Sequence, residues 1–422
     1  MKKLLSALMA LMLVISMFAM NVSADDAVVY VDGANGKDVA DGATGAKDNP
    51  FNNIIDAFSA LSETGGTIVI VGTVKGDAKW TVKKTVEDED GNVQETDEFN
   101  MSYQVMPAHK GTVVVTGADE NAVLDLNITS TTWINTDSTI YRNLKVNFGS
   151  ARIMFSSYAG HLVVEETCEF TGTPGGSYFY GTGVLEFYNN CGLAHGFANY
   201  PNFKPEIYKN DTVVVLGKNA VMGTIWGGLG EVVNNGAYII KDNAAVTTIW
   251  GCGQASSNAA STYVYIKGGS AGTINAKGSN GTEAAKSFII GGTGNDFKAT
   301  AVDWTATEVN ENAALFNKVV KEYKVTGDVN SFVNVANVAD GTKLFAIVDG
   351  AAVEMEYCNT VSDGVFFSTV EGATNYVFAD AVKVEEPKED EPTSAPTGDN
   401  MAVFAILGAV ALAGAFTFKK VR

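Results

Sequence analysis

The chain has 422 residues, of which 29 are Lys or Arg and 48 are Asp or Glu, giving a formal net charge of −19. A charge of this sign argues against nucleic acid or an anionic membrane surface as the main partner. Gly is frequent, at 44 residues, Pro is scarce, at 8, and only 18% of the residues are charged. This composition argues against a disordered chain and indicates a turn-rich protein with buried strands.

The N-terminus has the pattern of an export signal. Lys2 and Lys3 precede an apolar run, and Val22-Ser23-Ala24 supplies the small residues that signal peptidase requires before Asp25. We therefore expect residues 1–24 to be a cleaved signal peptide, with an uncleaved membrane anchor as the alternative. Either segment directs the rest of the chain out of the cytoplasm.

The C-terminus has the layout of a surface anchor. Residues 385–400 form an acidic, Pro-containing linker, and residues 401–418 contain no charge. The uncharged segment is close to the minimum of about 18 residues for a membrane-spanning helix. The basic tail, residues 419–422, predicts a cytoplasmic end.

This C-terminal order resembles the cell-wall sorting signal of Gram-positive surface proteins. The resemblance implies that a sortase cleaves the bond between Thr397 and Gly398 and joins the chain to peptidoglycan. Pro396 stands one place later than in the Leu-Pro-x-Thr-Gly pattern of that family, and a plain transmembrane anchor is the alternative. Both anchors predict an extracellular protein held at the cell surface.

The mature chain begins with a recognisable series of elements. A short strand at residues 28–31 is followed by a loop rich in Gly and Asp, an amphipathic helix after Pro50-Phe51, and a buried strand at residues 67–71. This order resembles the N-terminal cap of the pectate-lyase-like superfamily of right-handed parallel β-helix proteins. The resemblance implies that the helix covers the open end of a coil of stacked strands.

The central region repeats with a regular spacing. Thr224-Ile225-Trp226 recurs as Thr248-Ile249-Trp250 and as Thr273-Ile274-Asn275, about 25 residues apart each time. This period predicts a solenoid in which each coil buries its apolar face against its neighbours. A β-sandwich with evenly spaced strands is the alternative, but the repeated corners favour the solenoid. We predict an all-β, right-handed parallel β-helix over residues 25–305.

Two regions depart from this period. Asp90-Gly91, between two runs of alternating polarity, predicts a hairpin inserted at about residues 79–100. Beyond Asp303 the period fades into a polar stretch at residues 308–323 that is compatible with a helix, and short strands follow. We interpret residues 306–384 as a small β module, either a cap of the solenoid or a β-sandwich.

The resembled superfamily includes polysaccharide lyases and glycoside hydrolases. For a lyase, the resemblance implies an Arg that abstracts a proton beside a uronate carboxylate, with Ca²⁺ held by acidic residues. Arg142 precedes Glu165 and Glu166 by about one coil, so these three candidate catalytic residues could meet on one outer face. An ordinary cross-strand ion pair is the alternative, and we favour it.

No other catalytic or metal-binding motif occurs in the sequence. The acidic residues of the loop at residues 32–41 do not have the spacing of an EF-hand, so Ca²⁺ is left open and no other cofactor is expected. Four cysteines are too few for a disulfide framework. Cys168 and Cys191 are about one coil apart, and we expect them to stack as buried thiols rather than form a disulfide.

Aromatic residues are the candidates for a binding surface. Trp226 and Trp250 lie one coil apart, and Tyr178 and Tyr180 lie in a Gly-rich stretch. Aromatic faces spaced along a rigid surface suit sugar rings or the aromatic side chains of a partner. Stacks that only hold the coils together are the alternative.

The function expected from the sequence is adhesion, through binding of glycans or of host or cell-surface proteins. An anchored polysaccharide lyase or glycoside hydrolase is the alternative, and a structural component of a surface layer is the third hypothesis.

Overall fold

The computed structural model describes residues 27–75, 82–87, 93–98, 103–125, 132–135, 137–147, 155–157, 160–171, 179–180, 183–193, 197–198, 211–227, 235–252 and 261–383. The predicted signal peptide, the sorting motif at Thr397 and Gly398 and the predicted membrane segment lie outside these residues. No helix among the described residues is long and apolar enough to cross a membrane.

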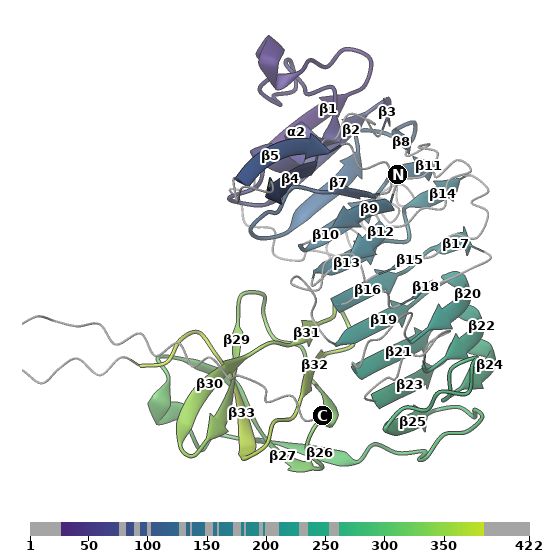
Figure 1. Ribbon diagram of the computed structural model, residues 1–422, viewed down its shortest axis with the longest axis vertical. Coiled ribbons are helices and arrows are strands. Elements are labelled where there is room, and N and C mark those ends of the chain that lie inside the picture. Colours follow the sequence, from purple (N-terminus) through teal and green to yellow (C-terminus); the bar gives the residue numbers. More distant parts are fainter. Residues whose placement is uncertain are drawn as a thin grey trace, which may run out of the picture. The chain divides into compact units, whose positions relative to one another are not determined.

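The largest element among the described residues is a ten-stranded sheet (Figure 1). In order across the sheet, its strands are β1 (Val28–Asp32), β2 (Gly66–Val71), β7 (Val113–Gly117), β10 (Thr139–Arg142), β13 (His161–Val164), β16 (Gly183–Phe187), β19 (Thr212–Leu216), β21 (Asn235–Lys241), β23 (Ser261–Lys267) and β25 (Lys286–Ile290). All of the pairings are parallel. Parallel strands in sequence order, joined by return segments, confirm the predicted solenoid and exclude the β-sandwich.

The return segments of the coils form three shorter parallel sheets within the described residues. The first contains β3 (Thr73–Lys75), β8 (Val123–Asp125), β11 (Lys145–Asn147) and β14 (Glu169–Thr171). The second contains β6 (Tyr103–Val105), β9 (Thr132–Asn135) and β12 (Phe155–Ser157). The third contains β15 (Phe179–Tyr180), β17 (Asn190–Leu193), β18 (Phe197–Ala198), β20 (Val221–Trp226), β22 (Ala245–Trp250) and β24 (Ser270–Asn275).

Side chains alternate between the inside and the outside of the solenoid along each strand. On the inside, Leu162, Leu185 and Val214 stand in register on β13, β16 and β19 and are at most 2% exposed. The same row continues through Tyr238 and Val264, which are fully buried. Each apolar side chain is therefore covered by its counterparts one coil before and after, which explains the period of the sequence.

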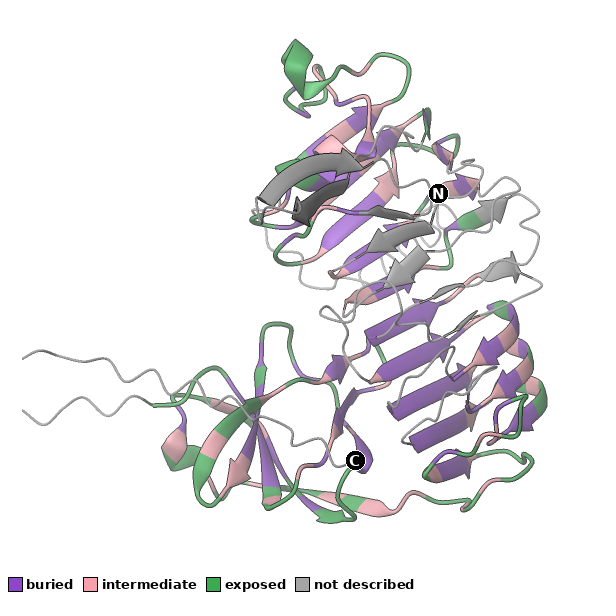
Figure 2. Cartoon of the chain, in the orientation of Figure 1, coloured by how far each residue is buried: buried purple, intermediate pink, exposed green. Residues whose placement is uncertain are grey.

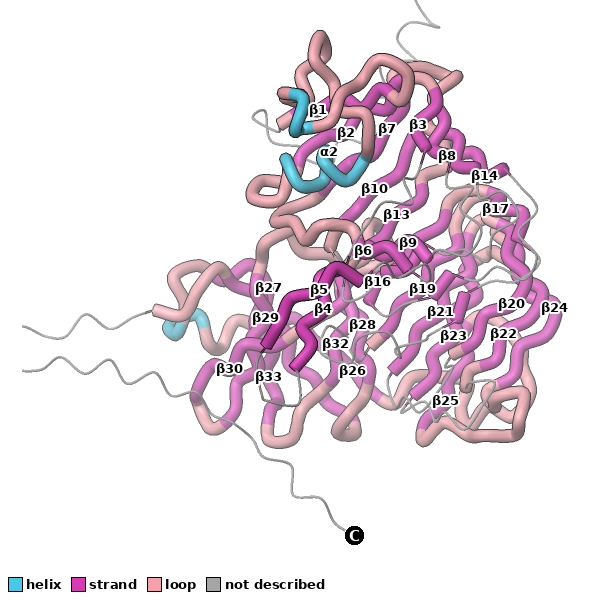
Figure 3. Tube along the Cα trace, turned by 45° about the horizontal axis from the view of Figure 1, so that its top comes forward, coloured by secondary structure: helices cyan, strands magenta, loops and turns pink. Residues whose placement is uncertain are grey.

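Helices are few among the described residues, as Figure 3 shows. They are α2 (Ile54–Ala60) and the short 3₁₀ helices η1 (Val39–Asp41) and η3 (Ala313–Leu315). Asn53 begins α2 by accepting a hydrogen bond from the backbone N–H of Asp56 at 2.9 Å. Ile54 and Phe58 of α2 are buried in the same core as the first coils, so the helix covers the apolar start of the solenoid.

β4 (Val82–Glu87) and β5 (Val93–Glu98) pair antiparallel, with Val82 opposite Glu98. They flank Asp90-Gly91, the dipeptide that predicts a hairpin turn in the sequence.

The C-terminal part of the described chain forms two antiparallel sheets, which we call the C-terminal module. One contains β26 (Trp304–Val309), β27 (Val319–Gly327), β33 (Ala373–Ala379), β29 (Lys343–Val348) and β30 (Ala351–Met355). The other contains β28 (Phe332–Val335), β32 (Val365–Ser368) and β31 (Cys358–Asn359).

The interpretation of residues 308–323 as compatible with a helix is wrong, because residues 308–309 end β26, residues 319–323 begin β27, and only the short 3₁₀ helix η3 lies between them. Its polar residues have partners both within the stretch and on β33. The buried carboxylate of Glu322 accepts hydrogen bonds from the amide groups of Asn312, at 2.6 Å, and Asn375, at 2.8 Å. Strand pairing with β33 therefore decides the structure of a segment whose composition alone suggests a helix.

Residues facing outward from the ten-stranded sheet change character along the solenoid. Ser138 and His161 are half-buried in the earlier coils, whereas Val184, Val213 and Tyr263, further along the same outward row, are at most 3% exposed. Figure 2 shows the same trend, since the strands of the later coils are buried throughout. The later strands are apolar on both sides because a second layer covers them.

The C-terminal module supplies this second layer. Phe332 and Phe366 of the module pack with Tyr263 and Tyr265 of β23 in one apolar cluster. The backbone N–H of Phe332 also donates a hydrogen bond to the Tyr263 hydroxyl at 3.1 Å. The module and the later coils therefore share one core and stabilise each other.

Asp363 of the module forms ion pairs with two lysines of the solenoid, Lys241 at 3.0 Å and Lys267 at 3.2 Å. Its side chain is only 5% exposed. Burial opposes ionisation of this carboxyl, but the hydrogen bonds and charges of the two lysines outweigh that effect and hold its pKa below the usual value. The ion pairs therefore stabilise the contact above the pKa of an unfolded Asp, and this stabilisation is lost as the pH falls through the lower folded-state pKa.

We expect Asp363→Asn to lower the free energy of unfolding by about 1–3 kcal/mol at pH 7, since it removes charge-assisted hydrogen bonds. Chemical denaturation at pH 7 and near pH 3 measures the effect, and the difference from the parent protein should shrink at the lower pH. Asp349→Asn, an exposed change of the same chemistry within the module, is the matched control and should have little effect. Equal effects of the two substitutions at both pH values would contradict the assignment.

Candidate functional site

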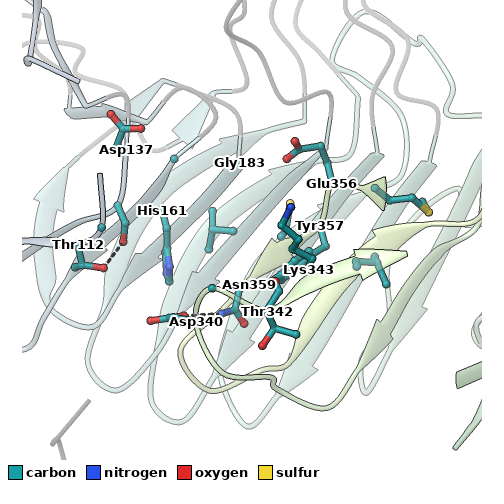
Figure 4. Close-up of a pocket in the computed structure, with 18 of the residues that line it drawn as sticks. Thr112, Asp137, His161, Gly183, Asp340, Thr342, Lys343, Glu356, Tyr357 and Asn359 are labelled. Atoms are coloured by element: carbon teal, nitrogen blue, oxygen red, sulfur yellow. Dashed lines mark hydrogen bonds between the residues drawn. The ribbon is translucent and has the colours of Figure 1, made fainter. Parts of the chain in front are cut away.

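Two cavities lie beside the contact between the ten-stranded sheet and the C-terminal module. The first, about 540 Å³ in volume, is called the Arg142 cavity, and its lining includes Arg142, Glu165, Glu166, Tyr188 and Lys218. The second, about 520 Å³, is called the His161 groove, and its lining includes His109, Asp137, Ser138, His161 and Tyr357 (Figure 4).

The Arg142 cavity contains all three catalytic candidates from the sequence. Arg142 is the last residue of β10, and Glu165 follows β13 directly, one coil later. Arg142 Nη2 lies 3.4 Å from Glu165 Oε1, and Glu166 Oε1 lies 2.8 Å from Lys218 Nζ. The coil spacing thus brings Arg142 and Glu165 together, as the sequence predicts, while the adjacent Glu166 pairs with a lysine further along the solenoid.

Burial and the neighbouring charges shift the pKa of Glu165 in opposite directions. Burial raises the pKa of Glu165 above its usual value, Arg142 and Lys218 lower it, and Glu166 raises it further. Arg142 Nε is buried and has no hydrogen-bond partner among the described residues. The cavity therefore places a carboxyl with a raised pKa beside a guanidinium.

The floor of the Arg142 cavity is apolar. Ile140 and Val163 face outward from β10 and β13 and cluster with Tyr188 and with Val361 of the module. A rim of charged groups above an apolar floor containing an aromatic ring is a common composition for a small-molecule site.

Glu186 connects the two cavities. It is fully buried on β16, where Oε1 lies 2.6 Å from His161 Nε2 and Oε2 accepts a hydrogen bond from the Tyr188 hydroxyl at 2.5 Å. Oε1 also accepts the backbone N–H of Val361, at 2.7 Å. A buried carboxylate needs such partners, and here they come from a neighbouring coil, from the residue that follows its own strand and from the C-terminal module.

His109 lies at the other end of the His161 groove. Its backbone N–H donates to Asp137 Oδ2 at 3.0 Å, and its Nδ1 donates to the carbonyl oxygen of Gly111 at 3.1 Å. Burial lowers the pKa of His109, although the Asp137 carboxylate and the Gly111 carbonyl oppose this effect. A neutral His109 that carries its proton on Nδ1 fits these contacts.

The structure places the aromatic candidates only in part. Trp226 and Trp250 stand in register on β20 and β22, with ring centroids 6.0 Å apart and ring planes 12° from parallel. Both are half-buried, and each ring covers part of a face of the other. Tyr178 and the side chain of Tyr180 lie outside the described residues.

The cysteine pair is also described only in part. Cys168 is a buried thiol whose pKa is raised by burial, so it is a poor nucleophile. The side chain of Cys191 lies outside the described residues.

In the loop of residues 32–41, the Asp32 carboxylate accepts hydrogen bonds from the backbone N–H groups of Ala34 and Asn35 and from the Asn35 side chain. No group of three or more His, Cys, Asp or Glu side chains that could hold a metal ion occurs among the described residues.

The sequence interpretation missed Glu186 and its partner His161. One signal was present: Gly183-Val184-Leu185-Glu186-Phe187 is an apolar strand with a single carboxylate, and such a residue requires a buried partner. The identity of the partners could not be predicted, because Val361 is distant in the sequence.

Comparison of the chain with protein-family models, with curated proteins and with solved structures finds no match. The strand pairing shows a β-solenoid of parallel strands, and a fold alone does not assign a function. Functional inference depends on the chemistry of the two cavities.

We expect an NMR titration of labelled Glu side chains to place the pKa of Glu165 above that of an exposed Glu. Arg142→Gln should raise it further, because the guanidinium favours the carboxylate form. Lys110→Gln, which removes an exposed ion pair to Glu63 elsewhere, is the matched control and should leave the value unchanged. A pKa for Glu165 below the usual value would contradict the effect of burial.

Proposed function

We propose that the protein is a right-handed parallel β-helix displayed on a cell surface, where it binds a saccharide in the Arg142 cavity. The observation that carries this proposal is the composition of the cavity. It has a volume of about 540 Å³, an apolar floor with the Tyr188 ring, and a rim of cations and carboxylates. Pockets for small ligands commonly measure about 300–1,000 Å³.

The rim suits hydroxyl groups in particular. A sugar hydroxyl both donates and accepts hydrogen bonds, so it can use carboxylates as acceptors and cationic groups as donors. Glu165, Glu166 and Asp242 supply the acceptors. Arg142 and Lys218 supply the donors.

The rim residues are also held in place before a ligand arrives. Arg142 is paired with Glu165, and Lys218 with Glu166. Side chains already ordered in the unbound protein lose little conformational entropy on binding. The ion pairs therefore support a preformed site as well as the stability of the solenoid.

A second candidate surface for the same function is the pair Trp226 and Trp250, together with Tyr178 and Tyr180. The two Trp side chains are half-buried and follow one row of the solenoid, which supports contact with an extended glycan or a protein partner. Because the two rings also stack on each other, a role limited to holding neighbouring coils is the competing explanation.

The alternative function is that of an anchored polysaccharide lyase or glycoside hydrolase. It is favoured by one observation, the raised pKa of Glu165 beside Arg142 in a cavity, since a carboxyl of this kind can act as a general acid. Ca²⁺ remains part of this alternative only.

Saccharide binding is tested on a glycan array with the full chain purified in detergent, followed by calorimetry with any glycan that binds. We expect Arg142→Ala to weaken binding by about tenfold or more, the effect of losing one hydrogen bond to a charged group. Lys110→Gln is the matched control and should bind as the parent protein does.

Other outcomes separate the alternatives. Binding that survives Arg142→Ala but is lost in Trp226→Ala or Trp250→Ala would move the site to the Trp surface. Depolymerisation of a uronate polysaccharide that requires Ca²⁺ and Arg142 would establish the lyase instead. A protein that binds no glycan on the array would remove the proposal.

The surface location rests on the export signal and on the C-terminal segment. If a sortase joins the protein to peptidoglycan, a muramidase should release it from intact Gram-positive cells and detergent alone should not. Thr397→Ala should then make the protein extractable by detergent. Release of the unmodified protein by detergent alone would favour the plain transmembrane anchor.

A further inference from the structure

The contact between His161 and Glu186 fixes the orientation of an imidazole in the His161 groove. His161 Nε2 lies 2.6 Å from the buried Glu186 Oε1, an oxygen of a carboxylate that can only accept a hydrogen bond when ionised. Nε2 therefore carries a proton. No hydrogen bond to His161 Nδ1 occurs among the described residues, so in the neutral ring this atom is an available acceptor in the groove.

Ser138 directly precedes β10, the strand next to that of His161. Thr139 pairs in register with Leu162, so Ser138 and His161, which precede them, are adjacent across the sheet. Neighbouring strands lie about 4.8 Å apart. Both side chains belong to the outward row and line the groove. No hydrogen bond joins these two described side chains in the unbound structure, and Glu186 holds the imidazole in place. A rotation of the Ser138 side chain can direct Oγ toward His161 Nδ1, since catalytic hydrogen bonds often tighten only when a substrate binds.

The hydroxyl of Ser138 is also oriented by its other neighbour. Thr112 donates a hydrogen bond to Ser138 Oγ at 3.2 Å, shown by the dashed line from Thr112 in Figure 4. With Ser138 Oγ accepting this bond, its own proton is available for donation to a base. A serine directly before β10, a histidine on β13 and a buried carboxylate on β16 thus follow one another across the sheet.

We propose that Ser138, His161 and Glu186 form a catalytic triad that hydrolyses a carboxylic ester in the His161 groove. The roles are those of nucleophile, general base and positioning residue, and a triad is recognised by this geometry rather than by sequence order. This activity is separate from saccharide binding in the Arg142 cavity and does not depend on it.

The reaction has two steps. Ser138 Oγ attacks the ester carbonyl carbon while His161 Nδ1 takes the hydroxyl proton; the carbon–oxygen bond to the alcohol then breaks, and His161 returns the proton to the departing alcohol oxygen. In the second step water attacks the acyl-serine with His161 again as the base, which releases the carboxylic acid and restores the Ser138 hydroxyl. Glu186 stays ionised and stabilises the imidazolium that forms in each step.

The lining of the groove indicates the class of ester. Asp137, Asp340, Glu354 and Glu356 lie along it, so an anionic substrate is disfavoured. Hydrogen-bonding side chains, including Tyr357 and Asn359, dominate the rest of the lining labelled in Figure 4. A neutral O-acyl ester of a polyhydroxylated alcohol, such as an acylated sugar, has the matching polarity.

A fluorophosphonate probe, which labels activated serines, tests the triad on the full chain purified in detergent. We expect mass spectrometry of digested protein to find the label on Ser138, and p-nitrophenyl acetate to be hydrolysed. Ser138→Ala and His161→Gln should each reduce hydrolysis by at least about 100-fold. Ser59→Ala, an exposed serine on α2, is the matched control and should retain both activities.

Glu186→Gln separates a positioning role from a structural one. We expect it to lower the rate and to move the acid limb of the pH–rate profile, because the charge that stabilises the imidazolium is lost. Circular dichroism of each variant establishes whether it is folded. If Glu186→Gln does not fold, Ser138→Ala still tests the triad. Folded parent protein that is neither labelled at Ser138 nor able to hydrolyse the ester would overturn the proposal.

Discussion

The structure depends on the apolar contact between the outward face of the later coils and the C-terminal module. Val213 and Val215 of β19 face the module rather than the interior of the solenoid, yet both are fully buried. Without the module these side chains would be exposed to water, and burial of apolar area is the main source of stability. The module is therefore part of the fold of the solenoid, and both cavities exist because its edge lies on the sheet.

Glu186 shows how closely function and stability are linked at that edge. It is the single carboxylate in an outward row that otherwise contains apolar residues such as Val163 and Val215. One of its three hydrogen bonds comes from the backbone N–H of Val361 in the module, so contact with the module completes the hydrogen bonding of the Glu186 carboxylate. The same carboxylate binds Tyr188, which lines one cavity, and His161, which lines the other, and so orients both side chains.

The predictable part of the structure is the part with local or periodic causes. The Thr-Ile-Trp corners predict the solenoid because each coil must repeat the pattern that its neighbours bury. Arg142 and Glu165 could be paired from their spacing of about one coil. The contacts of Glu186 could not be predicted from spacing. Glu186 binds His161, which is not its register partner on β13, and Val361, which belongs to the C-terminal module. Strand β27, which contains Glu322, was not predicted for the same reason. The amide groups of Asn312 and Asn375 donate hydrogen bonds to the Glu322 carboxylate only in the folded module.

The position of the His161 groove follows from where the module ends. Along one outward row, Thr112, Ser138 and His161 are polar and only partly buried. The next residues in that row, Val184 and Val213, are apolar and buried. A solvent-facing row can hold polar side chains, whereas a row beneath a second layer must be apolar or fully paired. The change from a polar residue at His161 to an apolar residue at Val184 thus marks the boundary of the covered surface. At this boundary the polar side chains lie next to the buried Glu186 carboxylate, which orients the His161 imidazole while the groove leaves it accessible.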